Sequence, residues 1–177
     1  IDGTKEFIKK NGEFTVNIAL LKNNKPTLGV VYSPYLNQVF FAEEGLGAFK
    51  INNINSFENL FQADIIDLST VLEPKTYTIV VSKSHMNNAT QKYVSKQILK
   101  FGKVNQIEVG SSLKICKVAD GSANCYPRFG PTMEWDTAAA HAVAKISGCK
   151  FYVADTPKRE LKYNKENLLN PYFIAER

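Results

Sequence analysis

The sequence predicts a layered fold of mixed α+β and α/β type, in which an antiparallel sheet precedes alternating strands and helices. Between Phe14 and Leu20, apolar residues occupy every second position, which is the period of a half-buried strand. After residue 76, short apolar runs alternate with stretches of helical spacing, a pattern typical of layered α/β units. The Asn-rich residues 53–75 show neither pattern. We therefore expect two units, residues 1–75 and residues 76–177.

The first unit is expected to be a β-meander with one uncovered face. The alternating strand is followed by Asn23, Asn24 and Pro26, which favour a hairpin turn. Further strand-like stretches follow as TLGVVYS, NQVFFA and GAFKI. The apolar side chains at positions 14–20 need burial, yet little in this unit supplies a helical face. We therefore expect the sheet to lack its covering helices.

The second unit is expected to alternate strands with helices. Residues 77–82 form a short apolar run of the buried-strand type, and residues 87–101 have helical spacing. A second helix is expected to open at residues 111–112, and a third to cover residues 136–147, with Gly148 just past its end. The other strands are predicted from the sequences NQIEV, NCY and FYV.

The composition is that of a globular protein with a substantial core. The chain has 177 residues, of which 44% are hydrophobic and 22% charged, and this balance argues against disorder. The net charge of +5 is scattered along the sequence and forms no continuous basic track. A nucleic-acid partner is therefore not expected, and a small anionic substrate fits the charge.

The cysteines and the hydropathy pattern bear on the compartment. Cys116, Cys125 and Cys149 lack the spacing of a zinc site, and their odd number argues against a disulfide framework. We expect buried thiols in a reducing compartment. No apolar run approaches the ~20 residues that cross a bilayer, and no signal-peptide pattern is present. The sequence thus predicts a cytoplasmic protein without a transmembrane segment.

Two carboxylates stand at expected helix N-termini. Asp2 precedes Gly3 and Thr4, and Asp136 follows Trp135. At such positions the helix dipole favours negative charge, and free backbone N–H groups can hold phosphate oxygens. Asp is also a favoured N-cap residue, and capping is the stronger interpretation for either site alone. Together, the two carboxylates could hold Mg²⁺, which prefers carboxylate oxygens and keeps waters for a phosphate.

Two further motifs place cations where they could meet an anion. GSSLK, at residues 110–114, brings small residues, hydroxyls and Lys114 to another helix start. A plain Ser N-cap with a solvated lysine is the favoured alternative. Arg128 lies within YPRFGP, on an expected loop that two prolines stiffen, which suits bidentate phosphate binding or stacking on a base. For Arg128, function and a structural role weigh about equally.

The two histidines receive different interpretations. His85 follows the expected strand at residues 77–82, where ligand-binding loops concentrate. His141 lies within an alanine-rich helix and is expected to pack in the core. The sequence shows no arrangement typical of a Ser/His/Asp triad and no Gly-rich Walker or Rossmann loop. Enzymes of these two classes are therefore not predicted.

The motifs IDGT, GSSLK, YPRFGP and WDTAA, in this order, resemble those of the inositol monophosphatase superfamily of lithium-sensitive, magnesium-dependent phosphatases. Within it, TKEFIKKNGEFTVNIAL, GSSLK and YPRFGP are most similar to the bacterial 3′(2′),5′-bisphosphate nucleotidases. The resemblance extends over essentially the whole chain, down to LLNPYFIA. It implies an inositol-monophosphatase-like αβαβα sandwich. The DGT motif would lie in an N-terminal antiparallel-sheet domain and the other motifs in a C-terminal α/β domain.

The resemblance also implies that the N-terminal portion of this fold is missing. The family motif reads Asp-Pro-(Ile or Leu)-Asp-Gly-Thr, and this chain begins after the Asp-Pro. The first Asp of the motif bridges two metals in the family, and a Gly-Glu-Glu metal motif lies upstream. We therefore expect the chain alone to be inactive but able to bind AMP or phosphate. A second departure is Ala140, where the family commonly has Gly, and its cost is expected to be small.

Residue by residue, the resemblance assigns metal binding to the Ile1 carbonyl, Asp2 and Asp136, in an enzyme with two or three Mg²⁺ ions. The Gly3 and Thr4 amides would bind the phosphate, and the Thr4 hydroxyl would help to orient the attacking water. Asp2 and Thr4 are thus the expected catalytic residues. The other expected substrate contacts are His85, Ser111, Lys114, Arg128 and Asp136.

The implied reaction turns 3′-phosphoadenosine 5′-phosphate into AMP and phosphate, a recycling step linked to sulfate assimilation. An inositol or sugar-phosphate phosphatase is the alternative with the same chemistry, and an inactive nucleotide-binding fragment is the alternative of another class. Lys114 and Arg128 discriminate the first two, because a second substrate phosphate needs cationic partners. The expected partner is a small nucleotide, in the cytoplasm or peripherally at the inner face of the cell membrane.

Overall fold

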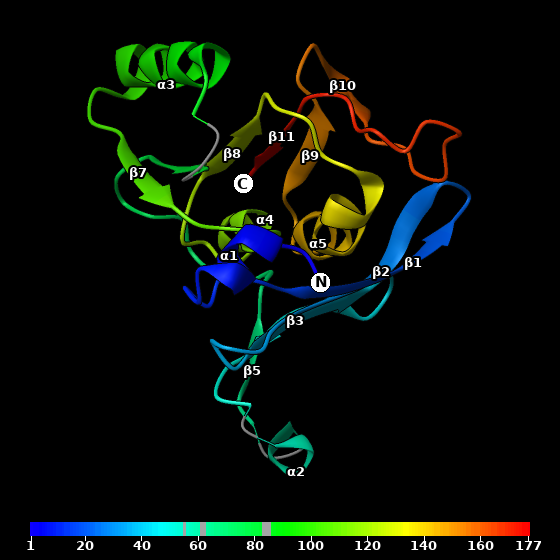
Figure 1. The fold of residues 1–177 in the computed structure, drawn as a ribbon. Helices are drawn as coiled ribbons and strands as arrows, with labels where there is room; N and C mark the ends of the chain where they lie inside the picture. The colour runs from blue at the N-terminus through cyan, green and yellow to red at the C-terminus, as the bar shows by residue number, and fades with distance from the viewer. Residues whose placement is uncertain (55, 61–62, 83–85) are drawn as a thin grey trace.

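A computed structural model describes residues 1–54, 56–60, 63–82 and 86–177, and it contains two sheets with two helices between them (Figure 1). The first sheet is antiparallel throughout, in the order β1-β2-β3-β4-β5. Strands that follow one another in sequence also pair in space, so the predicted meander is confirmed. The strands are β1 (Val16–Lys22), β2 (Lys25–Ser33), β3 (Gln38–Glu43), β4 (Gly47–Ile51) and β5 (Ile65–Asp67).

The second sheet is mixed and has the order β10-β9-β11-β8-β6-β7. Strand β6 runs parallel to β7 and β8, whereas β11 is antiparallel to both β8 and β9. The parallel part follows from the helices that connect its strands, because a parallel pair needs a crossover connection. The strands are β6 (Thr78–Val81), β7 (Asn105–Glu108), β8 (Cys125–Arg128), β9 (Lys150–Val153), β10 (Thr156–Glu160) and β11 (Phe173–Glu176).

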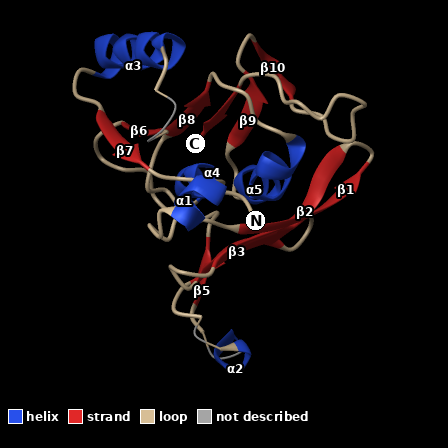
Figure 2. Ribbon diagram, viewed as in Figure 1, coloured by secondary structure: helices blue, strands red, loops and turns tan. Residues whose placement is uncertain are grey.

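The helices complete a layered arrangement (Figure 2). Helices α4 (Leu113–Ala119) and α5 (Glu134–Ile146) lie between the two sheets, and α3 (Asn88–Phe101) lies beside the second sheet, on the side away from α4 and α5. Helix α1 (Thr4–Ile8) is a short turn at the chain start, and α2 (Phe57–Leu60) lies between β4 and β5 in sequence. These are the α, β, α and β layers of the predicted αβαβα sandwich. None of the helices in the described part of the chain is both long and apolar enough to span a membrane.

The outer face of the first sheet is open in the described structure. Along β1, Val16, Ile18 and Leu20 point away from α5 and are 37%, 61% and 59% exposed, while Ala19 between them packs against the core. The period-two pattern was therefore interpreted correctly as a strand, but its larger apolar side chains lie on the open face. These side chains are in solvent in the described structure, and the expectation that the sheet lacks covering helices stays a prediction.

Helix α5 approaches the inner face of this sheet very closely, because small residues face each other across the contact. A Cβ atom on Gly29 of β2 would lie 2.2 Å from the carbonyl oxygen of Ala139 and 2.8 Å from Cβ of Ala142. One hydrophobic cluster consequently joins Val31 and Phe40 of the first sheet to α4, α5 and the second sheet. The division into units at residue 75 stays a prediction.

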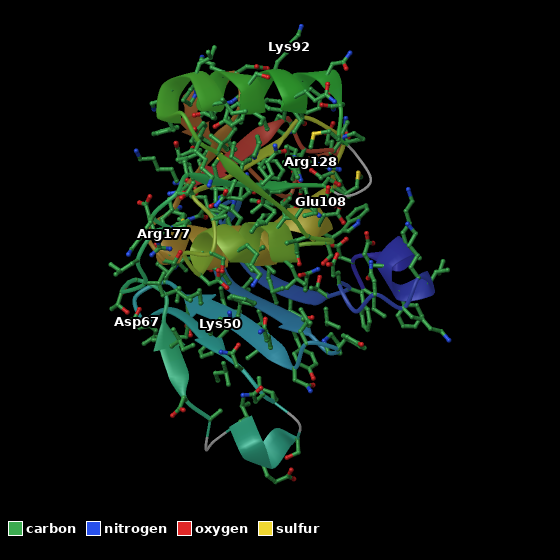
Figure 3. The ribbon with its side chains drawn as sticks, turned by 90° about the vertical axis from the view of Figure 1, so that its left-hand side faces the viewer. Lys50, Asp67, Lys92, Glu108, Arg128 and Arg177 are labelled. Carbon is green, nitrogen blue, oxygen red and sulfur yellow. The ribbon has the colours of Figure 1, made fainter. Side chains whose placement is uncertain are left out.

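The C-terminal end of α4 is held by two partly buried cations, Lys50 and Arg177 (labelled in Figure 3). Lys50 Nζ lies 2.9 Å from Asp120 Oδ2, and the Asp120 side chain is only 4% exposed. Arg177 donates hydrogen bonds to the carbonyl oxygens of Ala119 and Leu68, each at 2.7 Å. Cations are favoured at this end of a helix, where carbonyl groups lack partners. Helix α4 is thereby fixed to both sheets.

Several elements differ from the sequence-based expectations. Residues 53–75, expected to be irregular, include α2 and the edge strand β5, which is too short to show a periodic pattern. Helix α5 begins at Glu134, two residues before the predicted start, and β10 was not predicted. The three cysteines are buried and free, as predicted, and burial raises the pKa of each thiol.

Substituting Gly29 tests whether the close approach of α5 stabilises the fold. We expect Gly29→Ala to lower the free energy of unfolding by at least about 2 kcal/mol, because the added methyl group forces α5 away from β2. Chemical denaturation measures this change. Gly130→Ala is the matched control, since a Cβ there meets its nearest neighbour, in Arg128, at an ordinary 3.5 Å. Equal effects of the two substitutions would show that the contact is not tight.

Candidate active site

Six of the predicted site residues line one open pocket of about 140 Å³. The pocket lies where the chain start, the N-termini of α4 and α5, and the end of β8 meet. Ile1 and Thr4 are exposed and do not line it, and His85 lies outside the described residues. The six residues are Asp2, Gly3, Ser111, Lys114, Arg128 and Asp136.

Asp2 is fixed by a backbone bridge to the segment before β1. The Asp2 N–H donates to the Thr15 carbonyl at 2.9 Å, and the Thr15 N–H donates back at 3.0 Å. The backbone N–H groups of Ser112 and Gly3 lie near the Asp2 carboxylate and favour its ionised form. Burial, and next the charge of Asp136, raise its pKa above the usual value in spite of these donors. Two carboxylates therefore repel each other inside the pocket.

Asp136 stands in the first turn of α5 and is not the N-cap residue, contrary to the capping interpretation. Met133 occupies the cap position, and its N–H donates to Asp136 Oδ2 at 2.8 Å. The carboxylate thus satisfies one of the unpaired N–H groups at the helix start. This bond fixes the side chain on the pocket side of α5, where Asp136 lines the wall opposite the chain start.

The serines before α4 do not act as a simple cap either. Ser112 holds the cap position without a side-chain capping bond, and its Oγ lies 2.8 Å from both Thr15 Oγ1 and Asn17 Oδ1. Ser111 adopts a left-handed backbone with φ of 46°, which is unusual for a residue with a side chain. Its Oγ is buried in the pocket wall without a hydrogen-bond partner among the described residues. Both observations are typical of a ligand-binding loop.

Lys114 is a buried cation and not the solvated lysine of the alternative interpretation. Its Nζ donates to the Ser111 carbonyl at 2.7 Å, and burial lowers its pKa to about 8. The nearby carboxylates of Asp2 and Glu6 oppose this shift, whereas the charge of Arg128 adds to it. A bound anion would relieve the cost of burying this ammonium group.

Arg128 is the last residue of β8, so a strand end positions it and not the predicted loop. Its Nη2 donates to the Pro131 carbonyl at 2.8 Å, which ties the guanidinium to the following loop. Its Nε is buried without a hydrogen-bond partner in the part of the chain that the structure describes. A fixed guanidinium with an unused buried donor suits an anionic ligand.

The pocket thus holds two carboxylates and two cations, which we call its carboxylate pole (Asp2 and Asp136) and its cationic pole (Lys114 and Arg128); Asp2 and Lys114 are close enough to shift each other's pKa. Asp2 and Asp136 supply hard oxygen ligands, and a divalent cation between them would remove the repulsion that raises the Asp2 pKa. Among the described residues there is no cluster of three or more potential metal ligands of the Asp, Glu, His or Cys type. The donor set that is present fits a cation that keeps several waters, as Mg²⁺ does.

Sequence reasoning missed the residues that support these poles. The hydroxyl and amide groups of Thr15, Asn17 and Ser112 bond one another across 95 or more positions of sequence. Thr137 lines the pocket beside Asp136, and Glu6 lines it beside Lys114. Only the position of Thr137 within WDTAA gave a signal, because the other contacts depend on how distant segments meet.

Comparison with known proteins identifies similar chains. Residues 1–173 match the model of the inositol monophosphatase family. The 3′(2′),5′-bisphosphate nucleotidase CysQ of Shigella flexneri is 44% identical over 174 residues, and that of Escherichia coli K12 is 43% identical. Each alignment covers 98% of this chain and 64% of the relative, so the chain spans about two thirds of the length of these relatives.

Solved structures give the same result. The crystal structure of CysQ from Bacteroides thetaiotaomicron, a bacterial member of the inositol monophosphatase family, is 46% identical with a TM-score of 0.92. The match covers 99% of this chain and 66% of that chain. Mycobacterium tuberculosis SuhB, at 20% identity and a TM-score of 0.70, covers 99% of this chain and 63% of its own, and it shows the shared fold alone. The predicted fold class is confirmed.

Replacing Asp2 by an uncharged residue tests whether the pair of Asp2 and Asp136 binds a metal ion. We expect Asp2→Asn to raise the melting temperature in metal-free buffer at neutral pH, because it removes a carboxylate whose ionised form is disfavoured in the fold. The gain should vanish as the pH falls below the unfolded-state pKa of about 3.9, where Asp2 is protonated in both states. Millimolar Mg²⁺ should raise the melting temperature of the parent but not of the variant.

Thermal unfolding with and without Mg²⁺ measures both effects. Asp155→Asn is the matched control, because Asp155 is an exposed aspartate that does not line the pocket. A variant that keeps the Mg²⁺ response would show that Asp2 is not a metal ligand.

Proposed function

Because the chain belongs to the inositol monophosphatase family, we propose that its pocket is the active site of a metal-dependent 3′(2′),5′-bisphosphate nucleotidase. The substrate would be 3′-phosphoadenosine 5′-phosphate, and the products AMP and phosphate. The observation that carries the proposal is the pair of partly buried cations, Lys114 and Arg128, in the same pocket as two carboxylates. CysQ nucleotidases at 42–44% identity support the same substrate class.

The carboxylate pole is the place for the metal. Asp2 and Asp136 would hold Mg²⁺, with the Ile1 carbonyl as a further ligand that the family resemblance implies, and the complete site would use two or three ions. Bound there, Mg²⁺ would supply a water of lowered pKa and would neutralise charge on the phosphate that is cleaved. The Gly3 and Thr4 amides, at the start of α1, would hold oxygens of that phosphate. The family resemblance also implies that the Thr4 hydroxyl orients the water, although Thr4 is exposed and does not line the pocket in this structure.

The cationic pole is the place for the phosphate that is not cleaved. Lys114 and Arg128 come from α4 and β8, two rigid elements, so their charges are held in place before the substrate binds. The anionic substrate raises the pKa of Lys114 back toward its usual value, which keeps the ammonium charged in the complex. The unpaired Ser111 hydroxyl would add a hydrogen bond to the nucleotide, and His85 a further contact.

The proposed reaction belongs to nucleotide recycling linked to sulfate assimilation. Such a step takes place in the cytoplasm, and the three buried free thiols suit a reducing compartment. An inositol or sugar monophosphate would use the carboxylate pole equally well. It would leave Lys114 and Arg128 without a phosphate partner, which is why these two cations of the pocket favour the bisphosphate substrate.

Kinetics on two substrates test the proposal. In the whole protein, we expect Lys114→Ala or Arg128→Ala to lower kcat/KM for 3′-phosphoadenosine 5′-phosphate by about 30- to 1,000-fold, the effect of a lost buried charge contact of about 2–4 kcal/mol. Any turnover of inositol 1-phosphate should change far less. Steady-state phosphate release measures both.

Lys117→Ala is the control, because Lys117 lies one turn further along α4 with its Nζ 3.6 Å from Asp120 and outside the pocket. Asp120 keeps its closer ion pair with Lys50 when Lys117 is removed, so the control should remain close to the parent. Equal losses on both substrates would assign Lys114 and Arg128 a structural role. An inositol phosphatase with no bisphosphate activity would overturn the proposed function.

A further inference from the structure

A chain of five polar side chains runs along one face of α5, and the proposed function does not use it. Three members, Thr137, His141 and Lys145, are spaced four residues apart on α5. The other two, Glu160 and Tyr163, come from β10 and the segment after it, and each lies between two members from the helix. We call these five residues the polar ladder. It joins a partly exposed ion pair to the wall of the pocket.

The contacts of the polar ladder are continuous. Lys145 Nζ lies 2.6 Å from Glu160 Oε1, and the same carboxylate oxygen lies 3.2 Å from His141 Nε2. The other imidazole nitrogen, Nδ1, lies 2.8 Å from Tyr163 Oη, which in turn lies 3.3 Å from Thr137 Oγ1. Thr137 lines the pocket directly after Asp136.

Burying the polar side chains of the ladder costs folding free energy unless they pair with one another. His141 and Tyr163 are fully buried, and the imidazole stacks on Phe151 with ring centroids 4.0 Å apart. The imidazole therefore fills space in the core and also carries two polar nitrogens into it. A buried polar pair is retained in some proteins for the geometry that it fixes.

The contacts of the ladder differ in kind. His141 and Lys145 hold the pKa of Glu160 at about 2, so Glu160 is ionised, but its Oε1 and His141 Nε2, 3.2 Å apart, are not aligned for a hydrogen bond. Burial lowers the pKa of the imidazole, although Glu160 opposes this. Tyr163 donates its single proton to Thr137 Oγ1, so the imidazole Nδ1 is the donor in its contact with Tyr163 Oη.

Thr137 has a second anchor beside the pocket. The Asn170 amide nitrogen donates to Thr137 Oγ1 at 3.0 Å and to the Met133 carbonyl at 2.8 Å. Met133 is the residue whose N–H binds Asp136. Tyr163 and Asn170 therefore both hydrogen-bond Thr137 in the first turn of α5. The same turn carries the Asp136 carboxylate.

We propose that Tyr163 and His141 are positioning residues of the active site, which hold Thr137 and the first turn of α5 so that Asp136 faces the metal and the substrate. This inference rests on the proposed function for its kinetic consequence only. The structural alternative is that the ladder merely stabilises the core. The two roles predict different results for a substitution that keeps the shape of the side chain but removes its hydrogen bond. Only the positioning role predicts that such a substitution weakens metal binding at Asp136.

Tyr163→Phe separates the two roles, because it removes one hydroxyl and keeps the ring. Partners that orient a metal ligand through a hydrogen bond typically change metal affinity or activity by about 10- to 100-fold when they are lost. We expect a 10- to 100-fold weaker Mg²⁺ affinity in the whole protein, read from Mg²⁺-dependent melting temperatures, and a similar fall in kcat with a smaller change in KM. Tyr152→Phe is the matched control, because it removes a tyrosine hydroxyl bonded to Glu176, outside the pocket.

A second measurement is independent of catalysis. The ¹⁵N signals of the His141 imidazole, identified by their loss in His141→Gln, should shift in Tyr163→Phe, because Nδ1 loses its hydrogen-bond partner. A Tyr163→Phe protein with unchanged Mg²⁺ affinity and kcat, measured well below its melting temperature, would leave the ladder a purely structural role and overturn the inference. If the parent does not hydrolyse the bisphosphate, the proposed function fails, while the Mg²⁺ and ¹⁵N measurements still decide the role of the ladder.

Discussion

The close contact between α5 and the first sheet is the constraint on which the rest of the structure depends. Gly29 lets the helix backbone approach β2 to a distance that no Cβ permits, and alanines on α5 keep the helix surface flat enough for both sheets to pack on it. The same helix carries Asp136 in its first turn and the polar ladder along one side. The separation between α5 and the first sheet therefore determines where Asp136 lies relative to the start of the chain.

The pocket concentrates features that a purely structural region would avoid. Asp2 lies beside a second carboxylate, Lys114 is a buried ammonium group, and Ser111 combines a left-handed backbone with an unpaired hydroxyl. Each costs stability when the pocket holds no ligand. A cation at one pole and an anion at the other would relieve all three, so the pocket is complementary to a metal and a phosphorylated ligand. The supporting bonds, such as that between Asp136 and Met133, keep these groups from relaxing away.

The sequence predicted the strands and helices well where the pattern was long, and it singled out residues that line the pocket where a motif was compact. The period of two in β1 and the helical spacing of α3 were sufficient, and DGT, GSSLK and WDTAA placed Asp2, Lys114 and Asp136 at helix starts. The side to which β1 turns its larger apolar residues was not predictable, because alternation alone does not say which face is covered. Strand β5 was missed because it has three residues and is defined by its pairing with β4.

His141 shows why part of the site lies beyond sequence reasoning. An isolated histidine among alanines is most simply a packed residue, and the structure confirms that it is fully buried. His141 has a further role because Glu160 and Tyr163, which follow 19 and 22 residues later in the chain, lie on either side of its ring. Neither residue carries a motif, and their spacing from His141 has no helical or strand period. A burial prediction can therefore be right while the polar network, which depends on tertiary contacts alone, remains invisible in the sequence.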